Sequence, residues 1–285
     1  MAIKILVDSA SDIDATTAQT MGITMVPMEI NFGNEQYWDG VTLNSNEFFT
    51  KLVETGEFPK TSQINSARFT EQFAALTKDG SQVLCILMSS KLSGTFHSAQ
   101  QAAKEFGEQV AVVDSLNVCI GERILIEYAR QLVAQGQPLA EIVAELNRRK
   151  TNIKLVALLN TLQYLQKGGR ISRLTALVGS MVKLKPVIAI VNGEVRLVGK
   201  ALGSKNGNNR LTQLIQQSHG IDFGLPYAAA YSGLDASLLH KYLQDSTILW
   251  QAHTPAIPVY QIGSTIGTHA GPGAIAVAFF GGEHD

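Results

Sequence analysis

Ser93 stands in a stretch whose residue types could do chemistry, SSKLSGTFHSA from Ser89 to Ala99, directly behind an apolar run. Its hydroxyl could act as a nucleophile, hold an anion or cap a helix. The nucleophile elbow of hydrolases reads G-x-S-x-G, whereas Leu92 precedes this serine and Gly94 follows it, so that motif is not matched. His97 lies four residues further on and would share a helix face with Ser93, although a histidine in that place is commonly packing or surface.

We interpret Ser93 as the N-cap of the helix that follows it, with an anion site in the same place. A capping hydroxyl and the free N–H groups of the first helical turn face the same space, where the helix dipole also favours negative charge. Ser93, Gly94 and Thr95 would then offer two hydroxyls and unobstructed backbone donors to a carboxylate or a phosphate.

Three other segments carry polar residues that a packed core does not require. TSQINS begins at Thr61 and ends at Ser66, which we expect to cap the next helix, but the run ahead of that cap is unusually polar. In LQKGGRIS, the glycines before Arg170 allow a tight bend from which the guanidinium could clamp a carboxylate. His269 lies among glycines that do not fit G-x-G-x-x-G, and it could equally touch a ligand or be structural.

The elements that must position these residues alternate between β-branched runs and amphipathic helical segments. Apolar runs at 3–9, 23–30, 83–90 and 109–115 predict strands, with helices at 66–78 and 93–106 between them. This alternation favours a mainly parallel sheet covered on both faces, with a ligand beyond the carboxyl ends of the strands. Three of these strands end in small polar pairs, at Asp8-Ser9, Ser89-Ser90 and Asp114-Ser115.

The pattern restarts after about residue 150. A strand at 153–160 precedes a hairpin at 186–198, with Asn192-Gly193 as its two-residue turn, and strands follow at 227–233, 257–263 and 274–280. We therefore predict an α/β protein with two α/β domains, 1–150 and 151–285. The first has a mainly parallel sheet and the second a mixed sheet.

Composition excludes several classes of function. The 285 residues carry 23 basic and 24 acidic side chains, so bulk charge does not favour a nucleic acid partner. The chain has only two cysteines, with no CxxC and no histidine pair at ligand spacing, which argues against structural zinc and disulfides. No apolar run approaches the ~18 residues of a membrane span, and the N-terminus lacks a signal sequence, so we expect a cytoplasmic protein without a transmembrane segment.

Taken together, the motifs resemble the DegV family of bacterial fatty-acid-binding proteins. They occur in the order and spacing of that family and cover the chain from Ile3 to Phe280: DSASD at 8–12, TSQ at 61–63, SSKLSGTFHSA at 89–99, DS at 114–115, LQKGGRISRL at 165–174, LKP at 184–186 and IGTHAGPGA at 266–274.

The resemblance implies a carrier without catalytic activity, cofactor or metal. In this family two α/β domains enclose a long-chain fatty acid in an apolar tunnel. The carrier subunit presents the acid to a separate ATP-dependent fatty acid kinase, whose acyl phosphate enters phospholipid synthesis. The family's carboxylate ligands fall on Thr61 and Ser93, with the Gly94 backbone close by. Arg170 and His269 match the positions that complete the polar site.

Two departures from the family pattern affect these expectations. Ile64 replaces the proline of Thr-Ser-Gln-Pro, a change expected to loosen the loop that carries Thr61. Leu202 replaces a basic residue that the family places near Lys200 for kinase contact, which bears on the kinase partnership. Two alternatives also stay open: a serine hydrolase or acyltransferase using Ser93 with His97 or His269, and a binder of phosphates or sugar phosphates.

Overall fold

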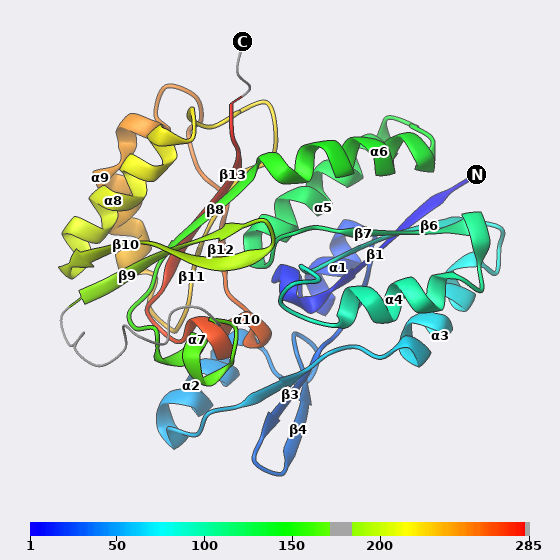
Figure 1. Cartoon of the computed structure of the whole chain (residues 1–285), viewed down its shortest axis with the longest axis horizontal. Helices are drawn as coiled ribbons and strands as arrows, with labels where there is room; N and C mark the ends of the chain where they lie inside the picture. Colours follow the sequence, from blue (N-terminus) through cyan, green and yellow to red (C-terminus); the bar gives the residue numbers. More distant parts are fainter. Residues whose placement is uncertain (172–183, 283–285) are drawn as a thin grey trace.

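The first sheet follows the predicted alternation of strands and helices. The computed structural model describes residues 1–171 and 184–282. In it the first sheet has the order β2-β1-β6-β7 with every pairing parallel. α3 and α4 cover one face, while α5 and α6 cover the other (Figure 1). The bounds are β1 (Ile3–Asp8), β2 (Thr24–Val26), β6 (Gln82–Leu87), β7 (Val110–Asp114), α3 (Ser66–Thr77), α4 (Thr95–Ala103), α5 (Cys119–Ala134) and α6 (Leu139–Arg149).

The predicted strand at 23–30 is wrong as a single element. Pro27 separates β2 from β3 (Glu29–Phe32), because a proline cannot donate to a strand ladder and constrains its own backbone. The chain leaves the first sheet there and enters a third, antiparallel sheet with the order β4-β3-β5. Here β4 spans Glu35–Trp38 and β5 spans Lys60–Ser62, so that Thr61 lies opposite Ile30.

The second sheet is mixed, as predicted. Its order is β10-β9-β8-β13-β11-β12, with β11 and β12 parallel and the other neighbours antiparallel. The predicted hairpin turn is confirmed, since Asn192 and Gly193 have φ values of 51° and 82°, as a type I′ turn requires. The strands are β8 (Ile153–Leu158), β9 (Leu184–Val191), β10 (Glu194–Leu202), β11 (Ala228–Tyr231), β12 (Val259–Gln261) and β13 (Ile275–Phe280).

Alternate residues of the second sheet face two different environments. On the outer face, α8 (Gly203–Gln217) and α9 (Ser237–Asp245) cover residues such as Val156 and Leu158. On the inner face, α5 contacts β8, β11 and β13, and residues such as Ala157 and Ala276 join a core that also includes the first sheet. This continuous inner core lies between the two larger sheets (Figure 1). The domain boundary between residues 150 and 151 stays a prediction.

The remaining elements border the space between the sheets. α7 and α10 pack against each other, and α10 also contacts α2, β3 and β5. The predicted cap at Ser66 is wrong by one residue, because Asn65 is the N-cap and accepts a hydrogen bond from the Arg68 amide at 3.0 Å. The helices not yet given are α1 (Ala15–Met21), α2 (Ser45–Thr55), α7 (Gln163–Lys167) and α10 (Ser264–Ala270), with 3-10 turns at Ser9–Ser11, Gly107–Gln109, Lys150–Asn152 and Thr247–Leu249.

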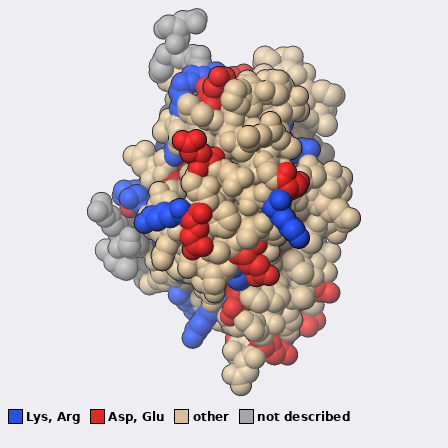
Figure 2. All heavy atoms as spheres, turned by 90° about the vertical axis from the view of Figure 1, so that its right-hand side faces the viewer, with Lys and Arg blue, Asp and Glu red and all other residues tan. Residues whose placement is uncertain are grey.

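The surface agrees with the nearly balanced charge. On the face formed by the right-hand side of Figure 1, basic and acidic side chains are interspersed rather than gathered into a patch of one sign (Figure 2). Among the described residues, no helix combines the length and the apolar character that crossing a membrane requires.

Candidate functional site

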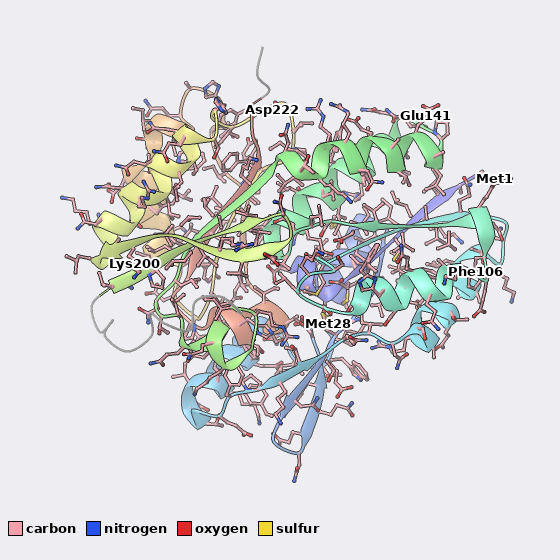
Figure 3. All side chains as sticks on the ribbon, viewed as in Figure 1. Met1, Met28, Phe106, Glu141, Lys200 and Asp222 are labelled. Carbon is pink, nitrogen blue, oxygen red and sulfur yellow. The ribbon has the colours of Figure 1, made fainter. Side chains whose placement is uncertain are left out.

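A cavity lies between the inner face of the second sheet, the start of α5 and the helix α10. Its empty volume is about 840 Å³, part of which is open to solvent. Met28, near the middle of the molecule in Figure 3, belongs to its wall. Most lining side chains are apolar: Met28, Met88, Leu92, Val118, Leu155, Ala157, Leu159, Ile188, Ile190, Ile262, Ile266, Ala270 and Ala276.

Four of the five predicted site residues line this cavity. Thr61 from β5, Ser93 from the loop before α4, Arg170 after α7 and His269 from α10 all belong to its wall. They come together because α10 contacts β5 and α7, although these segments are far apart in the sequence. The fifth residue, Gly94, is not among the lining residues. The structure therefore brings together a polar group from four separate elements. The last residues of the 165–174 motif, from Ser172 onward, lie outside the described residues.

Gly94 makes room for a neighbouring side chain. A Cβ at Gly94 would overlap Oε1 of Gln63, so a larger residue at this position would require the Gln63 side chain to move. Gln63 itself lines the cavity and is exposed, which places this part of the polar group near the surface. The sequence analysis quoted Gln63 within TSQ without giving it a role.

Ser93 is not the N-cap that was predicted. α4 begins one residue later than expected, with Gly94 as its N-cap, because the Ser93 amide bonds to the Ser89 carbonyl within the preceding turn. The Ser93 hydroxyl nevertheless accepts the Thr95 amide at 3.2 Å, so it still satisfies a free donor of the first turn.

The hydrogen bonds around Ser93 allow its hydroxyl to donate its proton to a further group. Thr95 Oγ1 lies 2.9 Å from Ser93 Oγ and itself accepts the Ile64 amide at 3.3 Å. Thr95 can therefore donate its proton to Ser93, whose oxygen then accepts two hydrogen bonds and has its own proton free for a third partner. Ser93 is thus arranged to donate to a ligand. The prediction that the Thr95 hydroxyl faces an anion is wrong, because Thr95 is fully buried, does not line the cavity and has its hydroxyl bonded to Ser93 and to the Ile64 amide.

Ile64 does not loosen its loop in this structure. The side chain is 1% exposed and packs in the inner core, while its amide bonds to Thr95. A proline at this position could not donate that hydrogen bond. The substitution thus ties the loop after Thr61 to the start of α4.

Thr61 is paired with His269 across the polar end. Thr61 Oγ1 lies 3.2 Å from His269 Nε2. Burial, together with the positive charge of Arg170, lowers the pKa of His269 to about 4, so the imidazole is neutral at pH 7. If Nε2 carries the proton and donates to Thr61, the threonine hydroxyl can donate to a ligand in turn. The other nitrogen, Nδ1, is buried and has no hydrogen-bond partner within residues 1–171 and 184–282, and a Cβ at Gly168 would overlap it.

Arg170 supplies an unpaired positive charge. Its Nε donates to the Leu92 carbonyl at 3.3 Å and its Nη1 to the Gly168 carbonyl at 2.6 Å, which hold the partly buried guanidinium in place. Across residues 1–171 and 184–282, no carboxylate lies within ion-pair distance of it. A held guanidinium with free N–H groups is suited to an anion.

Asp39 and Asp12, to which the sequence analysis gave no role, hold the start of α10 in place. Asp39 accepts the Ser264 amide at 2.9 Å and the Thr265 amide at 3.2 Å, and Asp12 accepts the Gly263 amide at 2.8 Å. The start of α10 is therefore satisfied internally and is not itself an anion site. Thr265 also lines the cavity, and its buried hydroxyl has no partner among the described residues.

The polar pairs at the strand ends support loops rather than a ligand. Asp8 accepts the Met88 amide at 2.9 Å, and Asp114 accepts the Ser90 amide at 3.2 Å. Burial raises the pKa of Asp8 to about 7, and it raises the pKa of the fully buried Glu122 as well. These acids lie behind the cavity, where Asp8 positions the chain at Met88, a lining residue.

The arrangement gives Ser93 no base. Within the described part of the chain, neither His97 nor His269 is hydrogen-bonded to its hydroxyl, and His97 is exposed. The described residues also contain no group of three or more His, Cys, Asp or Glu side chains that could hold a metal ion. The geometry instead offers hydroxyl and guanidinium donors at one end of an apolar cavity.

Comparisons with known proteins agree on one family. The family described as "Uncharacterised protein, DegV family" matches residues 2–281. A DegV domain-containing protein from Caldanaerobacter subterraneus subsp. tengcongensis is 31% identical over 280 residues, which cover 97% of this chain and 98% of that protein.

Two solved structures share the architecture and cover nearly all of this chain. A fatty-acid-binding DegV family protein from Thermus thermophilus superimposes with a TM-score of 0.88 and 30% identity over 99% of this chain and all of that chain. DegV from Bacillus subtilis, also a fatty-acid-binding protein, gives a TM-score of 0.83 and 26% identity over 99% of this chain and all of that chain.

Proposed function

This chain belongs to the DegV family, and from that premise we propose that it binds a long-chain fatty acid in a tunnel formed by its apolar cavity. The carboxylate is held by Thr61, Ser93 and Arg170, next to Gly94 and His269. The observation that carries the proposal is a cluster of donors in a mainly apolar cavity: Thr61 contacts His269, and Arg170 is bonded to the Leu92 carbonyl next to Ser93, while most other lining residues are apolar. Two relatives that cover nearly the whole chain bind fatty acids, which supports it.

The polar end suits an ionised carboxylate. A buried carboxylate needs several charge-assisted hydrogen bonds to offset the loss of hydration. Ser93 has a free proton when Thr95 donates to it, and Thr61 can donate when His269 donates to it. Arg170 adds a positive charge that no carboxylate of the described residues pairs with. Donors of this kind favour the ionised acid over a neutral ester, which lacks the charge that Arg170 would balance.

The apolar part supplies most of the affinity. Each buried methylene contributes about 0.8 kcal/mol, so a long acyl chain gains more from the cavity than its carboxylate gains from hydrogen bonds. The carboxylate end then fixes the orientation of the ligand. This division predicts an acyl ligand rather than a sugar phosphate, whose hydroxyls would find no partners along this wall.

A carrier role follows from the position of the carboxylate. Gln63 is exposed and Ser93 is partly exposed, so a carboxylate held there lies close to the surface while its tail is buried. A separate ATP-dependent kinase could then phosphorylate the acid without extracting it. Ser93 has no hydrogen-bonded base among the described residues, which favours binding over hydrolysis or acyl transfer.

The experiment that tests binding is mass spectrometry of small molecules released from the purified, denatured protein. We expect a stoichiometric long-chain fatty acid, depleted in Ser93→Ala but not in Ser237→Ala, an exposed serine on α9. A protein that is empty and takes up no acid on titration would reject the proposal. Turnover of an acyl ester that disappears in Ser93→Ala would favour the hydrolase instead.

The kinase partnership has its own test. Mixing the loaded protein with an ATP-dependent fatty acid kinase should produce acyl phosphate. Leu202 is 65% exposed in place of the family's basic residue, so Leu202→Arg should increase the rate if this surface contacts the kinase. Ile248→Arg, an equally exposed apolar position elsewhere, serves as the control. A bound acid that is never phosphorylated would reject the partnership and leave binding intact.

A further inference from the structure

The turn that carries Ser93 is organised around a serine to which the proposed function gives no role. Ser89 follows β6 at the end of the first sheet and is fully buried. Its carbonyl accepts the Leu92 amide at 3.0 Å and the Ser93 amide at 3.2 Å, and its hydroxyl accepts the Lys91 amide at 3.2 Å. Its own amide donates to the Asn117 carbonyl at 2.8 Å. The backbone of the whole turn is therefore held by Ser89.

Two donors of the cavity depend on where this turn lies. Ser93 is its last residue, and the Leu92 carbonyl accepts the hydrogen bond from Nε of Arg170 at 3.3 Å. A shift of the turn would move the Ser93 hydroxyl and one of the two carbonyls that hold the guanidinium. Hydrogen bonds to a charged group need short distances and good alignment, so such a shift would weaken the contacts of a carboxylate more than those of an acyl chain.

A further hydrogen bond ties the turn to the second sheet. The Ser89 hydroxyl donates to the Gly193 carbonyl at 2.8 Å, at the tip of the β9–β10 hairpin, which reaches the end of the first sheet (Figure 1). The hairpin is paired up to Val191 and Glu194, directly beside its type I′ turn, so the tip has a defined shape of its own. The contact is close, because a Cβ at Gly193 would overlap the Ser89 hydroxyl. A preformed hairpin tip thus supports the turn from outside the first sheet.

We propose that Ser89 is a positioning residue for the carboxylate, because its hydroxyl holds the turn of Ser93 against the hairpin tip. The inference rests on the proposed binding of a fatty acid at Ser93 and Arg170. In the described part of the chain Ser89 is not among the lining residues of the cavity, so it acts through the turn. The hydrogen bond to Gly193 keeps the donors in place before the ligand arrives, which reduces the cost of ordering them on binding.

The test compares a long-chain fatty acid with the fatty alcohol of the same length, by displacement of a fluorescent fatty acid whose own affinity is measured for each variant. Ser89→Ala should lower affinity for the acid about fivefold, the usual effect of one lost hydrogen bond. Affinity for the alcohol should stay within about twofold, because it has no carboxylate for Ser93 and Arg170 to hold. A loss of packing alone would weaken both ligands equally. Ser246→Ala, which removes another buried serine hydroxyl after α9, should change neither affinity.

The same hydrogen bond can be broken from the hairpin. Gly193→Ala places a Cβ against the Ser89 hydroxyl and should lower affinity for the acid relative to the alcohol, as Ser89→Ala does. Alanine at this position also strains the backbone, because Gly193 has a φ of 82°. Gly80→Ala is the matched control, since Gly80 has the same φ and a Cβ there would have no described atom within 4 Å. This control should leave both affinities unchanged.

The outcomes separate this inference from the proposed function. A wild-type protein that binds no fatty acid would refute the proposed function and the inference with it. If the wild type binds the acid and both Ser89→Ala and Gly193→Ala keep its ratio of acid to alcohol affinity, the fatty acid site stands and the inference is overturned. If Ser89→Ala does not fold, Gly193→Ala decides alone against Gly80→Ala, since a lower ratio supports the inference and an unchanged ratio rejects it.

Discussion

The two faces of the second sheet are built from the same strands but have different occupants. On the outer face, α8 and α9 cover a single hydrophobic cluster. Leu158, Tyr242 and Phe279 belong to this cluster and are fully buried. On the inner face, Ala157 and Ala276 line the cavity. The outer face is filled by its cluster, whereas on the inner face the small side chains of Ala157 and Ala276 leave space between larger residues such as Leu155.

This difference assigns neighbouring residues of one strand to different tasks. In β13, Ala276 borders the cavity while Val277 packs in the outer core. Because side chains alternate across a strand, a substitution at one residue should alter binding and a substitution at the next should alter stability. The following predictions test that separation, from the largest expected effect to the smallest.

Filling the inner face should abolish binding while leaving the fold. Ala276→Leu places a larger side chain in the middle of the cavity, and excluding about five methylenes would reduce affinity roughly 1000-fold. Titration calorimetry with a long-chain fatty acid measures this loss. Ala229→Leu is the matched change on the outer face, where overpacking should cost about 1 to 3 kcal/mol of stability and leave binding unchanged. Equal losses of affinity in both variants would contradict the separation.

Removing a large side chain from the outer face should reduce stability and leave fatty acid binding unchanged. Leu158 is fully buried against Gly207 of α8, and Leu158→Ala should lower the free energy of unfolding by about 3 kcal/mol. Denaturant titration gives this value, and fatty acid affinity under native conditions should stay within twofold of wild type. A variant of normal stability with weakened binding would show that the outer face serves the ligand.

Lowering the pH should reduce the free energy of unfolding through His269, which lines the cavity. The pKa of His269 is lowered to about 4, so the unfolded chain gains a proton below pH 6.5 that the folded chain does not. Stability should therefore fall from pH 7 to pH 5 relative to His269→Gln, by about 2 kcal/mol.

The difference between wild type and His269→Gln isolates this effect, because Asp8 and Glu122 have raised pKa values that change stability in the opposite direction. Unfolding curves at pH 7, 6 and 5 measure it. Leu158→Ala, on the outer face, retains His269 and should lower the free energy of unfolding at every pH while keeping the wild-type pH dependence. Parallel pH profiles for wild type and His269→Gln would disprove the assignment.

The smallest expected effect concerns a residue that orients Ser93. Thr95→Val removes the hydroxyl that is hydrogen-bonded to Ser93, and affinity for a fatty acid should fall about fivefold, close to 1 kcal/mol. Thr95→Ser should restore it, which a purely packing role would not require. Thr212→Val, on the outer helix α8, should leave affinity unchanged. No change on Thr95→Val would mean that Ser93 does not depend on this partner.

Local features of the fold could be predicted from the sequence. The turn at Asn192-Gly193 needs only two residues that tolerate positive φ, and it formed as predicted. Errors arose where a distant or neighbouring group competed with the local pattern. Asn65 capped α3 in place of Ser66, and Pro27 sent the chain from one sheet into another.

The polar residues of the site were also visible in the sequence, but their hydrogen bonds were not. Thr61 and His269 are 208 positions apart, and only the packing of α10 against β5 brings them to 3.2 Å. Thr95 was predicted to offer its hydroxyl to an anion, but that hydroxyl instead accepts the amide of Ile64, which lies in a loop 31 positions away.

The sequence by itself determined the alternation of strands and helices, the mixed character of the second sheet and the residue types at the polar end. These depend on periodicity, turn chemistry and short motifs, which are local. Only the tertiary structure decided which side chains fill the outer face of the second sheet, which hydroxyls lie within hydrogen-bond distance of each other and which residues line the cavity. Those properties depend on which side chains meet across sheets, and Leu155 and Ile190 form a wall only because β8 and β9 pair in one particular register.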